Sequence, residues 1–103
     1  MSLIVQKYGG TSVGTVERIE AVAKKVAASH REGNQLVVAV SAMSGETNRL
    51  IGLANEISSD TNLREMDVLV STGEQVTIAL LCMALQKLGI DALSYTGSQV
   101  RIL

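Results

Sequence analysis

The chain has 103 residues, of which 47% are hydrophobic, and its formal net charge is only −1. This length and composition are sufficient for one domain with a hydrophobic core. The charge lacks the basic excess that attracts nucleic acid or an anionic membrane surface, so neither is an expected partner.

No run of about 18 apolar residues is present, and the chain does not begin with a basic segment followed by a long apolar one. Neither a membrane span nor a secretory signal is therefore expected. The single cysteine, Cys82, cannot form an internal disulfide. A reducing, cytoplasmic location is the corresponding expectation.

A short strand, a glycine-rich turn and a helix open the chain. Residues 3–7 are apolar and branched and predict a buried strand, and residues 16–30 carry a helical apolar stripe with Thr15 as its N-cap. Gly9 and Gly10 lie between them. Backbone N–H groups in such a turn can bind a phosphate beside the helix N-terminus. The spacing matches neither the P-loop nor the dinucleotide fingerprint, and a tight turn that needs glycine remains the alternative.

The middle of the chain predicts a second strand and a second helix. Residues 35–41 form an unbroken apolar strand, residues 41–47 a loop, and residues 48–57 an amphipathic helix. Unbroken apolar strands that alternate with helices are typical of a parallel sheet covered on both faces.

The last third predicts mostly helix. Residues 58–62 are polar and indicate an exposed loop, and residues 64–71 favour a short helix. Residues 75–88 are apolar nearly all round, which predicts a helix buried in the sheet layers or in a subunit contact. Residues 91–95 predict a third strand. Three of the final four residues are apolar, and the end carries no terminating signal, as if the chain were cut.

The loops that follow parallel strands gather at the carboxyl edge of a sheet, where ligands bind. Residues 7–12 and 41–47 should therefore share one rim. Glu74 could reach the same rim from the N-terminus of the helix at 75–88. A cation, hydroxyls, backbone N–H groups and a carboxylate would then face one ligand.

Four blocks in the same order resemble the aspartokinases, which usually carry Phe in place of Tyr8. The blocks are Lys7-Tyr8-Gly9-Gly10-Thr11-Ser12-Val13, Val40-Ser41-Ala42-Met43-Ser44-Gly45-Glu46-Thr47-Asn48, Ser71-Thr72-Gly73-Glu74-Gln75 and Tyr95-Thr96-Gly97-Ser98-Gln99-Val100.

The resemblance implies a fold and an activity. The fold is the α/β, parallel-sheet α/β/α sandwich of the amino-acid-kinase (carbamate-kinase-like) type, with residues 1–103 as its amino-terminal part. The activity is ATP-dependent phosphorylation of L-aspartate to 4-phospho-L-aspartate, which leads to lysine, threonine and methionine. Mg²⁺ would arrive with ATP, because no spacing of ligands suggests a metal site built by the protein.

The resemblance also assigns site residues. Lys7 would stabilise the transferring phosphoryl group as the catalytic residue, and Glu74 would hold the α-ammonium of aspartate. The ATP phosphates would be bound by Lys7, Tyr8, Gly9, Gly10, Thr11 and Ser12, and the substrate by Ser41, Thr47 and Glu74.

Each assignment has a simpler alternative. Lys7 could be a solvated lysine at a strand end, Thr47 the N-cap of its helix, and Ser41 a polar loop residue. Glu74 could be only a favourable charge near a helix N-terminus.

Two other functions stay open: another kinase of the same fold, and a non-catalytic module that binds an anion or associates. The chain is much shorter than the family's kinase domain, so we expect it to be inactive alone. Apolar faces that lack their cover favour self-association.

Overall fold

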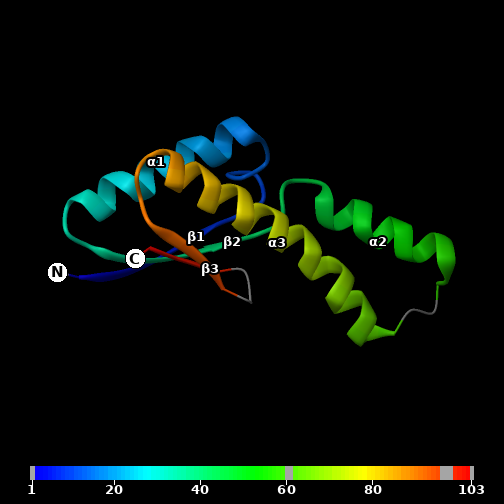
Figure 1. Cartoon of the computed structure of the whole chain (residues 1–103). Helices are drawn as coiled ribbons and strands as arrows, with labels where there is room; N and C mark the ends of the chain where they lie inside the picture. Colours follow the sequence, from blue (N-terminus) through cyan, green and yellow to red (C-terminus); the bar gives the residue numbers. More distant parts are fainter. Residues whose placement is uncertain (1, 60–61, 96–98, 103) are drawn as a thin grey trace.

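The computed structural model describes residues 2–59, 62–95 and 99–102, which form an α/β domain (Figure 1). The elements follow in the order β1 (Leu3–Tyr8), α1 (Val16–Arg31), β2 (Gln35–Val40), α2 (Glu46–Ile57), α3 (Leu63–Lys87), β3 (Ala92–Tyr95) and β4 (Gln99–Ile102). Asp60 and Thr61 of the predicted loop, and Thr96, Gly97 and Ser98 of the last motif, lie outside the described residues.

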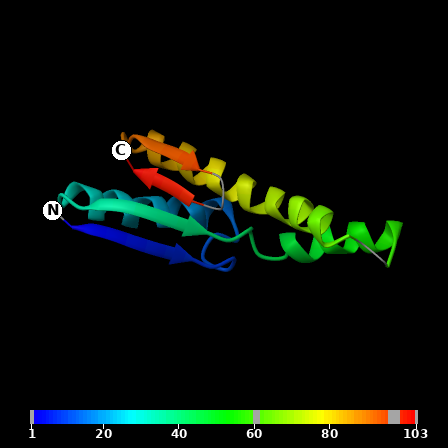
Figure 2. The same ribbon diagram turned by 90° about the horizontal axis from the view of Figure 1, so that it is seen from below.

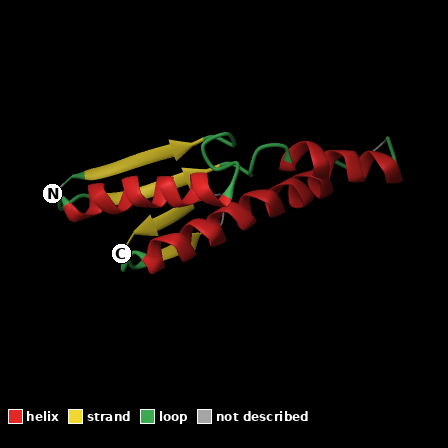
Figure 3. Ribbon diagram, turned by 90° about the horizontal axis from the view of Figure 1, so that it is seen from above, coloured by secondary structure: helices red, strands yellow, loops and turns green. Residues whose placement is uncertain are grey.

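The molecule is elongated, with extents of 49 × 24 × 17 Å. Helix α1 and the second half of α3 lie on one face of the sheet, which Figure 2 shows from the strand side and Figure 3 from the helix side. Helix α2 and the first half of α3 project beyond the strands as an antiparallel pair (Figure 1). The projection begins at the edge of the sheet where β1 and β2 end.

The sheet has the strand order β1-β2-β4-β3. Strands β1 and β2 are parallel, with Tyr8 opposite Val40, as the sequence predicts. Strand β4 was not predicted, and it runs antiparallel to both β2 and β3, with Val38 opposite Val100. The sheet of this chain is therefore mixed. The alternation of polar and apolar residues from Gln99 to Ile102 is the sequence signal for β4.

The expectation that the strands are buried on both faces is wrong for the described part of the chain. In β1, Ile4 and Tyr8 pack against the core, whereas Leu3 and Val5 are 65% and 69% exposed. None of the described helices covers the face on which Leu3 and Val5 lie (Figure 2). Two of the three layers of the expected sandwich are thus present.

The core lies between this sheet and helices α1 and α3. Its fully buried members include Val26 of α1, Val38 of β2, Leu81 and Leu85 of α3. Thr15 caps α1 as predicted, because its hydroxyl oxygen accepts a hydrogen bond from the N–H of Arg18 at 3.2 Å. These contacts fix α1 directly behind the glycine-rich turn.

Helix α3 corrects the prediction of two helices separated near residues 71–75. It is one continuous helix of 25 residues. The hydroxyl groups of Ser71, Thr72 and Thr77 donate hydrogen bonds to the carbonyl groups of Val68, Leu69 and Gly73. These polar residues, which are typical of a loop, therefore form their side-chain hydrogen bonds within the helix.

Within this chain residues 75–88 are not buried on all sides, because Val76 and Met83 are 50% and 61% exposed; burial in a subunit contact stays a prediction. By length and composition α3 could cross a membrane, with a mean hydropathy of 1.7 over its most apolar 18-residue window. This is weak evidence for a span, since core helices of soluble domains have the same composition and Leu81 and Leu85 pack on the sheet.

Candidate functional site: the rim at the carboxyl ends of β1 and β2

The glycine-rich turn and the loop at residues 41–45 meet at the carboxyl edge of the two parallel strands. The N–H of Ser41 donates a hydrogen bond to the carbonyl oxygen of Tyr8 at 3.1 Å. A Cβ atom at Gly10 would lie 3.0 Å from the carbonyl oxygen of Ala42. The two loops therefore touch, and they form the shared rim that the sequence predicts.

The glycine-rich turn is held tightly. The N–H of Ser12 donates to the carbonyl of Gly9 at 3.0 Å, and the Arg18 guanidinium on α1 donates to the carbonyl of Thr11 at 3.2 Å. The N–H groups of Gly10 and Thr11 have no acceptor among the described residues. A Cβ at Gly9 would meet nothing within 4 Å. Two backbone donors and an open approach are what an anion needs.

Lys7 is exposed near the end of β1. It forms no hydrogen bond or ion pair with any residue that the structure describes. Alternation along β1 places it on the face that the described helices leave uncovered. Its ammonium group is therefore available to a ligand at the rim.

Tyr8 lies on the opposite face of β1 from Lys7. Its hydroxyl donates a hydrogen bond to the side-chain oxygen of Gln6 at 3.1 Å, and its ring packs against the core. Burial raises the pKa of the Tyr8 phenol. The side chain is thus directed toward the helices, which leaves the backbone as the part of Tyr8 nearest to a phosphate.

The loop after β2 leads directly into α2. Ser41 and Thr47 are both partly buried, and helix α2 begins at Glu46, after Gly45 with φ of +83°. Gly45, rather than Thr47, is therefore the N-cap, which corrects the alternative considered for Thr47. Thr47 lies in the first helical turn, so its hydroxyl is not needed to cap the helix.

Glu46 and Arg49 form an ion pair that the sequence did not predict. The Arg49 Nε atom donates to Glu46 Oε1 at 3.0 Å. This hydrogen bond, together with the positive charge of Arg49, lowers the pKa of the Glu46 carboxyl. The spacing of three residues within one helix was the available signal.

Glu74 lies in the middle of α3, which overturns the expected position at a helix N-terminus. It is partly buried, on the helix stripe that continues through Ile78, Leu81 and Leu85. Ile78, Leu81 and Leu85 belong to the hydrophobic core, and Glu74 continues their stripe toward the amino-terminal half of α3. A favourable interaction of its charge with the helix N-terminus is therefore not expected, because this effect is confined to the first turn.

Ala42 joins the three parts of the site. Its carbonyl oxygen faces Gly10, and a Cβ atom at Gly73, next to Glu74, would lie 3.0 Å from the Cβ of Ala42. The glycine-rich turn, the loop that begins at Ser41 and the part of α3 next to Glu74 therefore converge at one buried alanine, although the Lys7 side chain lies on the face of the sheet away from α3. Sequence reasoning missed Ala42 and Gly73 as site-forming residues, although both lie inside the motif blocks.

The described residues contain no group of three or more His, Cys, Asp or Glu side chains that could hold a metal ion. Cys82 is buried, and desolvation raises the pKa of its thiol. It is therefore a core residue rather than a nucleophile.

The sheet with helices on one face, the glycine-rich turn and the two loops that meet at the carboxyl ends of β1 and β2 define an α/β domain. The chain belongs to the amino acid kinase family, whose model matches residues 2–102.

Its relatives include an aspartokinase from Pseudomonas aeruginosa, 71% identical over 103 residues, and aspartokinase 2 from Bacillus subtilis, 57% identical over 102 residues. The first match covers 100% of this chain and the second 99%, but each covers only 25% of the relative. The crystal structure of aspartate kinase from Synechocystis matches with a TM-score of 0.88 and 58% identity, over 90% of this chain and 16% of that one.

The resemblance to aspartokinases and the amino-acid-kinase fold predicted from the motifs are therefore confirmed. The chain spans about a quarter of the length of the curated relatives it matches.

Proposed function

We propose that this chain forms part of the catalytic site of an aspartate kinase. In the reaction, the γ-phosphoryl group of ATP passes to the side-chain carboxylate of L-aspartate, giving 4-phospho-L-aspartate and ADP in the route to lysine, threonine and methionine. The observation that supports the proposal is the meeting, at Ala42, of the glycine-rich turn, the loop that begins at Ser41 and the part of α3 next to Glu74.

The glycine-rich turn would hold the phosphates. Phosphoryl transfer depends mainly on neutralising the charge of the transferred group and on aligning the nucleophile. The unpaired N–H groups of Gly10 and Thr11 and the open backbone at Gly9 suit phosphate oxygens. The hydroxyl of Ser12 adds a further donor. Mg²⁺ bound to ATP would neutralise part of the phosphate charge.

Lys7 would act on the transferring group itself. Its ammonium has no partner among the described side chains, so no ion pair has to break before it contacts a phosphoryl oxygen. A mobile full charge beside fixed backbone donors is suited to the charge that develops during transfer.

The second loop and α3 would hold the amino acid. Glu74 would bind the α-ammonium group of aspartate, while the hydroxyls of Ser41 and Thr47 would contact its carboxylates. All three side chains are partly buried, which strengthens their hydrogen bonds and charge interactions.

A chimaeric enzyme tests this proposal, because we expect this chain to be inactive alone. The corresponding stretch of the Pseudomonas aeruginosa aspartokinase is replaced with this chain, and ADP release is measured with aspartate. The chimaera should be active. Lys7→Met should lower kcat by about 100-fold or more, whereas Lys25→Met on the exposed side of α1 should not. Glu74→Gln should mainly raise the KM for aspartate.

Two results would contradict the proposal. A chimaera that phosphorylates another acid in preference to aspartate would indicate a different kinase of the same fold. Full activity of the Lys7→Met chimaera would remove the proposed catalytic role.

A further inference from the structure

Arg18 connects helix α1 to the glycine-rich turn. Its backbone N–H donates to the hydroxyl oxygen of Thr15 at 3.2 Å, and its guanidinium Nη1 atom donates to the carbonyl oxygen of Thr11 at 3.2 Å. The side chain thus reaches back from the first turn of α1 into the segment that contains the free backbone donors. Hydrogen bonds from charged donors are stronger than neutral ones, so this contact is suited to hold a segment that glycines leave free to move.

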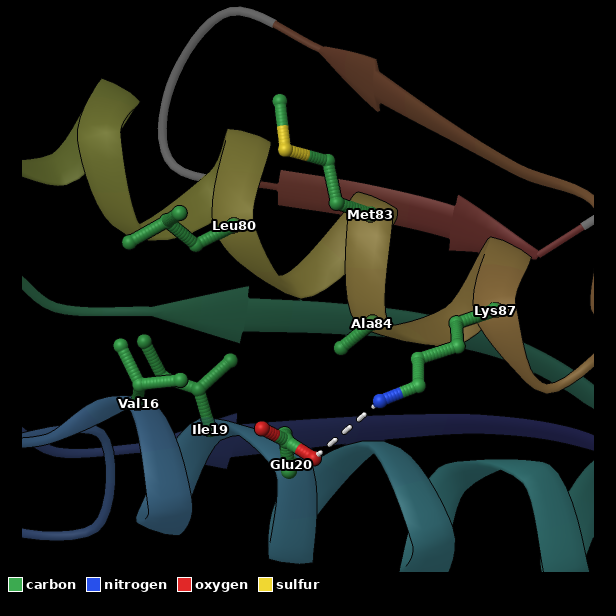
Figure 4. A pocket seen from close by; sticks show the side chains of 7 residues that line it. All are labelled: Val16, Ile19, Glu20, Leu80, Met83, Ala84 and Lys87. Carbon is green, nitrogen blue, oxygen red and sulfur yellow. Dashed lines mark ion pairs between the residues drawn. The ribbon is translucent and has the colours of Figure 1, made fainter.

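Helix α1 gives Arg18 a fixed support. The next residue, Ile19, is 2% exposed and belongs to the core, and it lines a cavity of about 200 Å³ together with Leu80 and Ala84 of α3 (Figure 4). Glu20, one residue further along, lies 3.9 Å from Lys87 of α3, and Figure 4 shows this ion pair as a dashed line. The guanidinium of Arg18 therefore extends from a helix whose position is set by its packing on α3.

The hydrogen bonds of the turn link the Arg18 contact to a free donor. The carbonyl of Thr11 and the N–H of Ser12 belong to one planar peptide group, in which Arg18 holds the carbonyl and Gly9 accepts from the N–H at 3.0 Å. The accepting carbonyl of Gly9 shares the next peptide group with the N–H of Gly10. Because N–H and C=O point in opposite directions in a trans peptide, the N–H of Gly10 is turned away from Ser12. The orientation of this donor, which has no acceptor among the described residues, therefore depends on the peptide that Arg18 holds.

Arg31, in the last turn of α1, makes the same kind of contact far from the rim. Its Nη2 atom donates to the carbonyl oxygen of Leu88 at 2.9 Å, and it lies about 20 Å farther along the helix than Arg18. Neither arginine forms an ion pair within the described part of the chain. The charge of Arg18 is therefore free to attract phosphate, and Arg31 is an arginine with the same bonding in a different place.

We propose that Arg18 is a positioning residue for the nucleotide. By holding the carbonyl of Thr11, it keeps the N–H groups of Gly10 and Thr11 directed at the phosphate oxygens, and its charge lies beside them. The inference rests on the proposed function, because the phosphates are those of the ATP that the turn would bind. It adds to that function a residue outside the turn on which the affinity for ATP depends.

The chimaeric aspartokinase tests the effect on the nucleotide. Arg18→Met should raise the KM for Mg²⁺–ATP by about tenfold, because a charge-assisted hydrogen bond and a nearby positive charge are lost. The KM for aspartate should change by less than about twofold, since the amino acid is held by other segments. Arg31→Met should leave both KM values within about twofold of the parent chimaera, although it loses an equivalent hydrogen bond. Circular dichroism checks that each variant is folded.

NMR of the isotope-labelled chain tests the positioning without any catalysis. In Arg18→Met, the exchange of the Ser12 amide with water should become more than about threefold faster, because its bond to Gly9 is no longer supported from Thr11. The shift of the Gly10 amide on addition of Mg²⁺–ATP should be smaller in Arg18→Met than in Arg31→Met.

The outcomes separate this inference from the proposed function. A parent chimaera that does not phosphorylate aspartate counts against the proposed function, and the two NMR measurements then decide the role of Arg18. In an active chimaera, equal KM values for Mg²⁺–ATP in Arg18→Met and Arg31→Met overturn the inference. An unchanged exchange rate of the Ser12 amide, or equal Gly10 shifts in the two variants, overturns it as well.

Discussion

Gly73 packs directly against Ala42: a methyl group at position 73 would lie 3.0 Å from the Cβ of Ala42. The same methyl group would lie 3.4 Å from the Cγ of Glu46 and the Cδ1 of Leu50. Gly73 thus lets α3 approach both the loop after β2 and the first turns of α2. This close approach places Glu74 beside the segment that contains Ser41 and Thr47.

Gly73→Ala should destabilise the chain by about 1–3 kcal/mol, because overpacking at Ala42 outweighs the better helix propensity of alanine. Gly52→Ala is the matched control, since a Cβ at this helical glycine meets nothing within 4 Å. It should stabilise the chain by about 0.5–1 kcal/mol. Urea unfolding of both variants is the measurement, and equal stabilisation by the two substitutions would contradict the packing described for Gly73.

Gly10→Ala should also destabilise the chain, by about 1–3 kcal/mol, because the new Cβ would lie 3.0 Å from the carbonyl oxygen of Ala42. Gly9→Ala has open space around it and should change the free energy of unfolding by less than about 0.5 kcal/mol. The pair separates the role of Gly10 in packing from the role of Gly9 in ligand approach. Thermal unfolding that ranks Gly9→Ala as the less stable variant would refute this distinction.

Thr15→Ala should cost about 0.5–2 kcal/mol, because the N–H of Arg18 loses the hydroxyl oxygen that accepts its hydrogen bond at 3.2 Å. Thr15→Ser keeps the cap and should cost much less. Chemical denaturation monitored by circular dichroism measures both. If serine and alanine proved equally destabilising, the lost methyl group rather than the cap would be responsible.

The first half of the fold was predictable because its signals are local. The apolar run at 3–7, the Thr15 cap and the apolar run at 36–40 define β1, α1 and β2 within a residue or two of the observed ends. The meeting of residues 7–12 and 41–47 at one rim followed from the same pattern, since loops after parallel strands share one edge of a sheet, whereas the roles of the site residues came from the resemblance.

The errors arose where a tertiary contact decides the structure. Ser71, Thr72 and Gly73 suggest a break in a helix. Instead, the two hydroxyl groups donate hydrogen bonds to carbonyl groups within α3. Gly73 lies where a Cβ atom would come within 3.0 Å of the Cβ of Ala42. Glu74 was therefore predicted at the start of a helix, but it lies in the middle of one. No local signal reveals which residue a glycine must approach.

The Glu46–Arg49 pair gives a pH dependence. The hydrogen bond and charge of Arg49 lower the pKa of Glu46 in the folded chain, so the pair stabilises the fold above the unfolded-state pKa. The stabilisation is lost as the pH falls through the lower, folded-state pKa. Arg49→Gln should raise the pKa of Glu46, which an NMR titration of its side-chain carboxyl carbon measures. An unchanged pKa would show that the pair does not persist in solution.

The central claim is that one rim at the ends of β1 and β2 receives a nucleotide's phosphates. The most direct measurement is an NMR titration of the isotope-labelled chain with Mg²⁺–ATP at millimolar concentration. We predict that the amide signals of Gly9, Gly10, Thr11 and Ser12 shift together, and that Lys7→Met strongly weakens the response. If the shifts appear instead at the opposite end of the sheet, around Asn34 and Arg101, or are unaffected by Lys7→Met, the account is contradicted.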